Sequence, residues 1–438
     1  MKKSLNELRG SLSQSELNTL KSIYDFRCLT AQQIYQLHYQ KLAVVQQSVA
    51  EGACDSGIKR MLSHELIKTV EFKGNEIAYF LTPVGIEVVR HNFELPTNIY
   101  DAKKKVVKRG YYRASELDMY PKHINHQAHL NQFVIDFQTR ELDCNWKYFD
   151  EKYVSNYTHI RPDGLLSILD TDFFLEMDMA TESKKQLCEK WENYRNFLLS
   201  REYAYREKKI VVLFIVDGTE MLQKRIDLIK HTIYERLLET MDSEFEIYVG
   251  TSDQLLNLLE RRLLPISKGI TPNPIKLVRE VLEKVHGFQV IEGYKVKNEF
   301  NGIKYGFYIS KYNQEGVLKE NNRYQEFLVD DYFSESPTIV SKVSYHDRNN
   351  TFFLNKHGRE MAYLVIAKNE AQAYKDLRMC DAIGLPNIYF TTYQRLKERP
   401  FHEAVFQYDL LGNMHHFTNN GLEERVYEDT FSDQVVKR

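Results

Sequence analysis

The stretch from residue 158 to residue 194 limits most strongly what this chain can fold into. It contains two short apolar runs, residues 165–169 and 173–175, separated by a polar turn. A longer polar stretch that favours helix follows the second run. Two apolar runs around a turn, followed by a helical stretch, predict a β-hairpin that leads directly into a helix.

Acidic residues lie at the ends of both predicted strands. Asp163 precedes the first strand, and Glu176 and Asp178 end the second. Because side chains along a strand alternate between its faces, Glu176 and Asp178 face the same way, and Asp163 can reach the same spot. Carboxylates beside an apolar core need compensation, and Mg²⁺ or Mn²⁺ prefers such oxygen ligands. The alternative is a solvated hairpin whose acids simply face water.

The helix after the hairpin supplies candidate partners for these acids. A nearby lysine could orient an attacking water or stabilise charge on a scissile phosphate. Glu182 could orient that lysine or a metal-bound water. Tyr194 is one candidate nucleophile among 29 tyrosines, and nothing in the sequence selects it.

Residues 13–92 contain the elements of a small DNA-binding module. Three helices are expected, of which the first has Ser15 as N-cap, the second has Thr30 as N-cap, and the third begins at Ser56. Residues 67–72 and 77–81 alternate like two strands around a turn. Thr82 is the expected N-cap of a further helix. This order predicts a winged helix-turn-helix, in which the third helix enters the major groove and the wing meets the backbone.

Basic side chains on this module and behind it are the candidate DNA contacts. A charged helix face, a solvated linker helix or a protein-docking module would explain the same residues without DNA. The candidates on the third helix and the wing are Lys59, Arg60, His64 and Lys73, and those in the following segment are Lys103, Lys104, Lys105, Lys108 and Arg109.

Composition and charge restrict the class of protein. Residues 1–124 contain 18 Lys and Arg and 13 Asp and Glu, so their formal charge is +5. Because the whole chain has a net charge of −2, the remaining residues carry −7. This asymmetry favours a DNA-binding domain joined to a domain with an acidic site. The five cysteines are scattered, which disfavours a zinc ribbon or a disulfide framework. The absence of a signal peptide and of an apolar span predicts a cytoplasmic protein without membrane partners.

Three histidines recur at a spacing of three on a predicted helix over residues 123–142. His123, His126 and His129 lie on one slanted face of that helix. A metal site is one interpretation, and an ordinary helix face is the favoured one. No His-x-His pair occurs in the chain, which disfavours the chemistry of nicking enzymes that use such a pair.

The remainder of the chain predicts two α/β units. Residues 209–216 (KIVVLFIV) read as a strand buried on both faces, and a helix, a strand and a further helix follow it. Together with the hairpin they predict a mixed-sheet α/β core. After a proline-containing linker near residue 265, a similar order of elements predicts a second, smaller α/β domain.

These residues resemble the PD-(D/E)xK nuclease superfamily. Pro162-Asp163, Glu176-x-Asp178 and a lysine on the next helix are similar to its motif, in which two acids bind Mg²⁺ and a lysine assists the water or the phosphate. The usual lysine position holds Asp178 here, and the resemblance moves that role to Lys190 or Lys185.

More narrowly, residues 15–260 resemble the replication-relaxation family and MobC-type plasmid relaxases. The similar blocks are RPDG at 161–164, LExDxxTE at 175–182, and Lys190 with Tyr194. The resemblance implies a plasmid or conjugative-element protein that nicks or relaxes double-stranded origin DNA as a Mg²⁺-dependent endonuclease, alongside conjugation or replication proteins. The alternative is a non-catalytic DNA-binding protein for plasmid replication or copy control on a decayed nuclease scaffold.

The expected fold class is α+β and α/β, in three domains. The first is a winged helix-turn-helix over residues 1–97, the second is a restriction-endonuclease-like mixed-sheet domain over 98–264, and the third is an α/β domain over 275–438 that repeats the nuclease half-fold in degenerate form.

Overall fold

A computed structural model gives the fold of the chain in two compact units. One unit contains residues 1–156, 161–169 and 174–179, and the other contains 157–160, 170–173 and 180–438. The structure describes residues 5–41, 47–100, 104, 106–142, 144–154, 157–218, 220–241, 244–264, 274–292, 305–311, 326–349, 351, 354–355, 361–418 and 421–423. The mixed α+β class expected from the sequence is confirmed.

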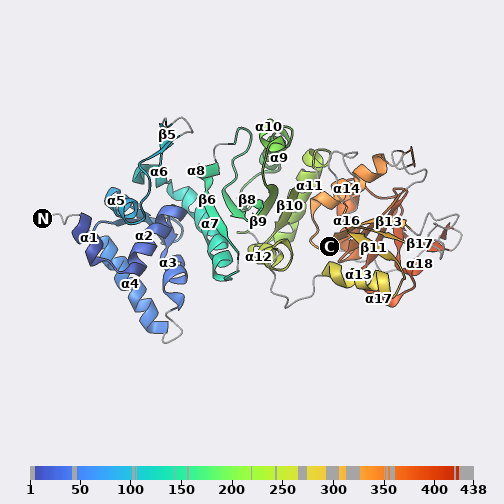
Figure 1. Ribbon diagram of the computed structural model, residues 1–438, viewed down its shortest axis with the longest axis horizontal. Coiled ribbons are helices and arrows are strands. Elements are labelled where there is room, and N and C mark those ends of the chain that lie inside the picture. Colours follow the sequence, from blue (N-terminus) through green and yellow to red (C-terminus); the bar gives the residue numbers. More distant parts are fainter. Residues whose placement is uncertain are drawn as a thin grey trace. The chain divides into compact units, whose positions relative to one another are not determined.

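The first unit opens with helices and a small antiparallel sheet (Figure 1). Ser13, and not Ser15, is the N-cap of the second helix, because its side chain and that of Glu16 form a reciprocal capping box. Thr30 and Thr82 are N-caps as expected. The elements are α1 (Leu5–Ser11), α2 (Gln14–Phe26), β1 (Leu29–Thr30), α3 (Ala31–His38), α4 (Gln47–Ser63), β2 (Ile67–Glu71), β3 (Ile77–Leu81) and α5 (Pro83–Asn92).

The predicted hairpin after α4 is confirmed, whereas the start of α4 differs from the expectation. Strands β2 and β3 pair antiparallel from Ile67 opposite Leu81, and β1 joins β3 on its other side. Gly74 and Asn75 form the turn with φ of 56° and 68°, the left-handed region that these two residues favour. Helix α4 begins nine residues before the expected Ser56, at Gln47, because Ala50 and Cys54 extend its buried face.

A two-stranded ribbon follows α5. It consists of β4 (Asn98–Tyr100) and β5 (Val106–Arg109), which pair antiparallel and extend away from α5 and α6 (Ala114–Leu117) (Figure 1). Its base is fixed closely: the Gly110 amide donates to Thr97, and a Cβ on Gly110 would lie 2.1 Å from the Pro96 carbonyl oxygen. The solvated linker helix considered for this segment is therefore replaced by a strand pair on the described residues.

Helix α7 (Pro121–Thr139) packs an apolar stripe into the first unit. Leu130, Phe133 and Val134 on this helix are buried. The buried Asn131 amide donates to the carbonyl oxygens of Phe26 and Cys28 at 3.2 and 2.7 Å. Those bonds satisfy backbone acceptors at the end of α2, so α7 is fixed against the N-terminal helices.

The hairpin of residues 158–194 belongs to a five-stranded sheet. Its order is β10-β9-β8-β7-β6, with β6 antiparallel to β7 and β9 parallel to β10. Strand β9 is buried along almost its whole length, as its apolar run predicted. The elements are β6 (Trp146–Asp150), α8 (Glu151–Val154), β7 (Gly164–Ile168), β8 (Thr171–Asp178), α9 (Lys184–Leu198), α10 (Arg201–Ala204), β9 (Lys209–Val216), α11 (Leu222–Leu237), β10 (Phe245–Gly250), α12 (Ser252–Leu258) and the π-helix η2 (Leu259–Leu263).

A second sheet, of eight strands in the order β11 to β18, follows in the second unit. Apolar clusters cover both of its faces, one with α14 and α16 and the other with α13, α17 and α18 (Figure 1). The elements are α13 (Pro274–Lys284), β11 (Gln289–Glu292), β12 (Phe307–Ser310), β13 (Glu326–Tyr332), α14 (Pro337–Arg348), β14 (Ala362–Ala367), α16 (Glu370–Met379), β15 (Ile388–Thr392), α17 (Tyr393–Glu398), α18 (Phe401–Ala404), β16 (Phe406–Tyr408), β17 (Met414–Thr418) and β18 (Gly421–Glu423).

The two sheets share one order of elements. In the first, α7 precedes β6, β7 and β8, and α9, β9, α11 and β10 follow, apart from the short α8 and α10. In the second, α13 precedes β11, β12 and β13, and α14, β14, α16 and β15 follow. In both sheets these five strands are neighbours in chain order, the first pair antiparallel and the last pair parallel. The division into domains at residues 97, 264 and 275 stays a prediction.

Candidate functional site

Asp163 connects the start of β7 to the end of β8. Its backbone amide donates to the Leu175 carbonyl oxygen at 2.9 Å, and its Oδ2 accepts the Met177 amide at 2.8 Å. The Asp163 side chain therefore replaces a backbone acceptor for β8 at the point where the hydrogen bonds between β7 and β8 end. Since Met177 lies between Glu176 and Asp178, the structure brings Asp163 to the strand segment that carries both other acids.

His126 of α7 reaches the same segment, which sequence reasoning missed. Its Nε2 lies 2.9 Å from the Met177 carbonyl oxygen and 3.3 Å from Asp163 Oδ2. Both neighbours are acceptors, so Nε2 carries the proton and donates. Spacing placed His123, His126 and His129 together on a helix face, but only the tertiary structure shows that His126 meets the end of β8.

Glu176 and Asp178 are buried, with 2% and 1% of their surface exposed. The end of β8 is buried on both faces, which the alternation rule alone does not reveal. A buried carboxylate is costly without a hydrogen-bond donor or a cation nearby. This burial excludes the alternative in which both acids face water.

The candidate catalytic residues on and before α9 differ in their surroundings. Lys190 forms an ion pair with Glu182 at 3.0 Å, and its Nζ lies 5.2 Å from the centre of the Phe214 ring. Lys185 is largely exposed and lies 3.8 Å from Glu189. The other oxygen of Glu182, Oε2, is buried and has no hydrogen-bond partner within the described residues. Lys190 and Glu182 therefore form the more enclosed pair.

Tyr194 belongs to the apolar core. It is 1% exposed, and its ring packs at 5.5 Å from that of Trp191 and 6.2 Å from that of Phe245. A nucleophile must reach its substrate, so this position favours a packing role for Tyr194.

No group of three or more His, Cys, Asp or Glu is arranged to hold a metal ion in the part of the chain that the structure describes. Mg²⁺ commonly uses only one or two carboxylates, together with waters and substrate phosphates. A pair drawn from Asp163, Glu176 and Asp178 fits that smaller requirement. The three-acid site stays a prediction.

The candidate DNA contacts on the helical module are unequal. Lys59 on α4 and Lys73 at the turn between β2 and β3 are exposed, and His64 after α4 is half-buried. Arg60 pairs through Nε with the buried carboxylate of Glu16 at 3.1 Å. Arg60 therefore joins α4 to α2, and its contribution to DNA binding would compete with that contact.

The excess positive charge of residues 1–124 is concentrated in and around the ribbon of β4 and β5. Residues 13–92 contain eight basic and eight acidic side chains, whereas residues 98–113 contain six basic ones and a single acid. Lys104 is exposed, Lys108 lies in β5, and Arg109 pairs with Glu116 at 2.7 Å. Lys103 and Lys105 lie outside the described residues. The charge distribution favours the ribbon over α4 as the phosphate-contacting element.

Comparisons with known proteins relate part of this chain to a family. No curated protein and no solved structure matches this chain. No helix in the described ranges is long and apolar enough to cross a membrane. Residues 20–213 match the model of the replication-relaxation family, which indicates a role in the processing of plasmid or replication DNA.

Proposed function

We propose that this protein is a metal-dependent endonuclease that nicks and relaxes double-stranded DNA at a plasmid origin. The observation that carries the proposal is the junction of β7 and β8. Asp163 accepts the amide of Met177, the residue between Glu176 and Asp178, where β7 begins and β8 ends. The MobC-type and PD-(D/E)xK resemblances support the same chemistry, as does the family match.

Glu176 and Asp178, with Asp163 beside them, are the groups that would hold Mg²⁺ or Mn²⁺. When bound, such an ion lowers the pKa of a bound water and stabilises charge on the scissile phosphate. The chain itself fixes the geometry. The Met177 amide and His126 hold Asp163 by Oδ2, so this carboxylate is oriented before substrate arrives.

Lys190 and Glu182 are the proposed catalytic pair, with Lys185 as the exposed alternative. The ion pair holds the Lys190 ammonium in position, which suits the stabilisation of a phosphate oxyanion. The Oε2 of Glu182, which has no hydrogen-bond partner among the described residues, is the proposed acceptor of a hydrogen bond from an attacking water.

DNA recognition is assigned to the winged helix-turn-helix and to the ribbon behind it. Lys59, His64 and Lys73 supply contacts from the third helix and the wing. The ribbon lysines supply phosphate contacts. Replacing Lys104 with Ala should lower the slope of log affinity against log salt by about 0.9, because one phosphate contact is lost. Fluorescence anisotropy with an origin duplex measures this slope, and an unchanged slope would contradict the ribbon assignment.

Cleavage is tested with supercoiled plasmid that carries the cognate origin, in the presence of Mg²⁺. The wild-type chain should yield open-circular product, and Glu176→Gln should not. Glu189→Gln is the matched control, because Glu189 is an exposed acid whose only described partner is the exposed Lys185. If Glu176→Gln nicks as fast as the control variant, the enzyme proposal fails.

A second candidate is a non-catalytic DNA-binding protein for plasmid replication or copy control. Two observations favour this candidate. Asp178 is an acid at the usual position of the catalytic lysine, and Lys190 already forms an ion pair with Glu182. Under this candidate, wild type binds origin DNA in the anisotropy assay and produces no open-circular DNA with either metal ion.

A further inference from the structure

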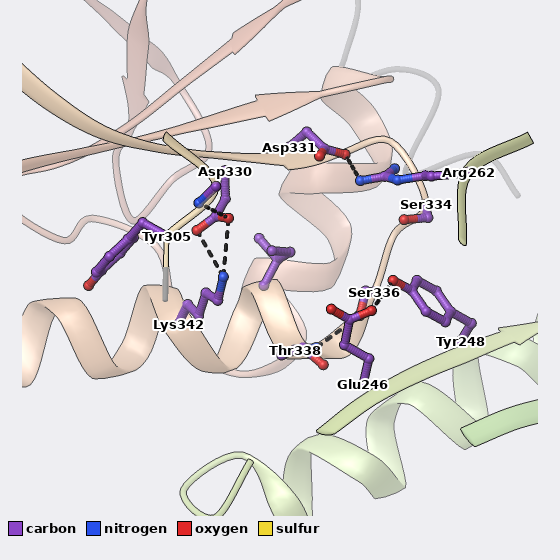
Figure 2. A pocket seen from close by; sticks show the side chains of 12 residues that line it. Glu246, Tyr248, Arg262, Tyr305, Asp330, Asp331, Ser334, Ser336, Thr338 and Lys342 are labelled. Carbon is purple, nitrogen blue, oxygen red and sulfur yellow. Dashed lines mark hydrogen bonds and ion pairs between the residues drawn. The ribbon is translucent and has the colours of Figure 1, made fainter. Parts of the chain in front are cut away.

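The second unit contains a polar cavity. Its volume is about 250 Å³, and its walls come from β10, η2, the start of β12, the end of β13 and the first turns of α14. Figure 2 shows charged side chains from several of these elements pointing toward one another across it. Glu246, Arg262, Asp330, Asp331, Ser334 and Lys342 carry its chemistry.

The carboxylates Asp330 and Glu246 are already satisfied. Asp330 accepts the Gly306 amide at 2.9 Å, Lys342 at 3.1 Å to each oxygen, and the Tyr363 hydroxyl at 2.9 Å. Glu246 accepts Lys209 at 2.7 Å on one oxygen and the Tyr248 hydroxyl on the other. Burial raises the pKa of Glu246, but Lys209 and Tyr248 outweigh it, so the pKa lies below its ordinary value.

The donors of the cavity are not used up. Within the described residues, Arg262 donates only to Asp331, and a guanidinium has five N–H groups. Lys342 donates only to Asp330 among described partners, which leaves one of its three N–H groups. The Ser334 hydroxyl lines the cavity and has no hydrogen bond to any described residue. A ligand that uses these remaining donors must therefore supply hydrogen-bond acceptors.

The start of α14 adds to this preference. Ser336 is its N-cap and accepts the Thr338 amide at 3.3 Å, and both residues line the cavity. The N-terminal end of a helix carries partial positive charge and favours anions. Arg262, with a quarter of its side chain exposed, lies nearer solvent than the buried Lys342. An anion would therefore meet one cation on entry and a second one inside.

The geometry points to a binding site for a phosphate monoester in this cavity, held by Arg262, Lys342 and Ser334. A phosphate offers acceptor oxygens in several directions, which matches donors that come from η2, α14 and the loop between β13 and α14. The phosphate could belong to a free mononucleotide or to the terminal phosphate of a DNA strand. No step of the nicking proposal is needed for this site.

Calorimetric titration of the full chain tests the assignment. The probes are inorganic phosphate, deoxyadenosine 5′-monophosphate, deoxyadenosine, and a short single strand with and without a 5′-phosphate. Binding should require the phosphate, so deoxyadenosine should bind at least about tenfold more weakly than its monophosphate, because charge-assisted bonds are lost. If the mononucleotide prevails, the ligand is a free nucleotide, and if only the 5′-phosphorylated strand gains affinity, it is a DNA end.

Arg262→Gln should weaken phosphate binding at least about tenfold. Arg348→Gln is the matched control, because Arg348 forms an exposed ion pair with Glu239 in the same unit. Because Arg262→Gln leaves Asp331 without its cation, Ser334→Ala is a second variant that removes no charge and should also weaken binding. The assignment is overturned if no phosphate probe binds at millimolar concentration, or if both variants bind like the control.

Discussion

Each sheet has a carboxylate that joins the second and third strands of its series, but the surroundings of the two carboxylates differ. In the five-stranded sheet, Asp163 at the start of β7 is held by the Met177 amide and His126. In the eight-stranded sheet, Asp330 near the end of β13 is held by the Gly306 amide at the start of β12 and by Lys342 of the next helix. Both carboxylates therefore link the second strand of the series to the third.

The difference lies in the cation. Lys342 neutralises Asp330 directly, and Tyr363 completes the hydrogen bonds of that carboxylate. The lysine in the corresponding helix of the first sheet, Lys190, pairs instead with Glu182. Asp330 is therefore a structural carboxylate, saturated by partners within its own unit. Equal topology therefore does not imply equal chemistry.

The largest expected effect is on stability in the second sheet. Lys342→Met leaves Asp330 buried without its cation and should lower the free energy of unfolding by about 3–5 kcal/mol. Urea unfolding followed by circular dichroism measures this loss. The double variant with Asp330→Asn should recover much of it, because no uncompensated charge remains. A single variant as stable as wild type would show that the pair is not structural.

The next effect is on nicking in the first sheet. Glu176→Gln should reduce the rate of open-circular product formation by about 100-fold or more, a loss of about 2.7 kcal/mol in transition-state stabilisation. Glu370→Gln, at the start of α16, removes an acid that pairs with Arg395 in the second unit, and it should leave the rate unchanged. Equal losses in the two variants would contradict the distinction between a catalytic and a structural set of acids.

A smaller effect is expected from pH, through His346 on α14. Its Nε2 donates to the Met361 carbonyl at 2.7 Å and its Nδ1 accepts the Tyr305 hydroxyl at 2.9 Å, so it is neutral. Burial lowers the pKa of His346 to about 4. The unfolded chain then binds the extra proton, and stability that is fully present above the ordinary pKa near 6.5 is lost as the pH falls toward 4.

The expected loss from His346 is about 2 kcal/mol between pH 6.5 and pH 5. Urea unfolding at both pH values measures it, and His346→Gln should flatten the dependence. His402→Gln removes an exposed histidine of the same unit and should not. An identical pH dependence in His346→Gln and wild type would exclude His346 as its source.

The smallest effect on stability is expected at Lys190. Lys190→Met should cost about 1 kcal/mol or less, because both partners of its ion pair retain access to water. The same variant should nevertheless reduce nicking strongly if Lys190 is catalytic. A stability loss as large as that of Lys342→Met would make the two lysines equivalent and remove the contrast between the sheets.

Much of the fold could be predicted because it depends on local patterns. The hairpin of β2 and β3 follows from Gly74 and Asn75 between alternating strands, and the buried β9 follows from a continuous apolar run. The start of α4 was predicted too late, because Ala50 and Cys54 are small and give a weak apolar signal. The N-cap was placed at Ser15 because serine at either position fits the pattern, and only the bond to Glu16 selects Ser13.

The alternation of residues, the positions of chain reversals and the acids that end β8 could be derived from the sequence alone, since they depend on neighbours in the chain. The pairing of His126 with Asp163, of Arg60 with Glu16 and of Lys342 with Asp330 depends on how distant elements pack together. Such pairs join elements far apart along the chain. No periodicity encodes them, because a charged side chain takes its partner from whichever element packs against it.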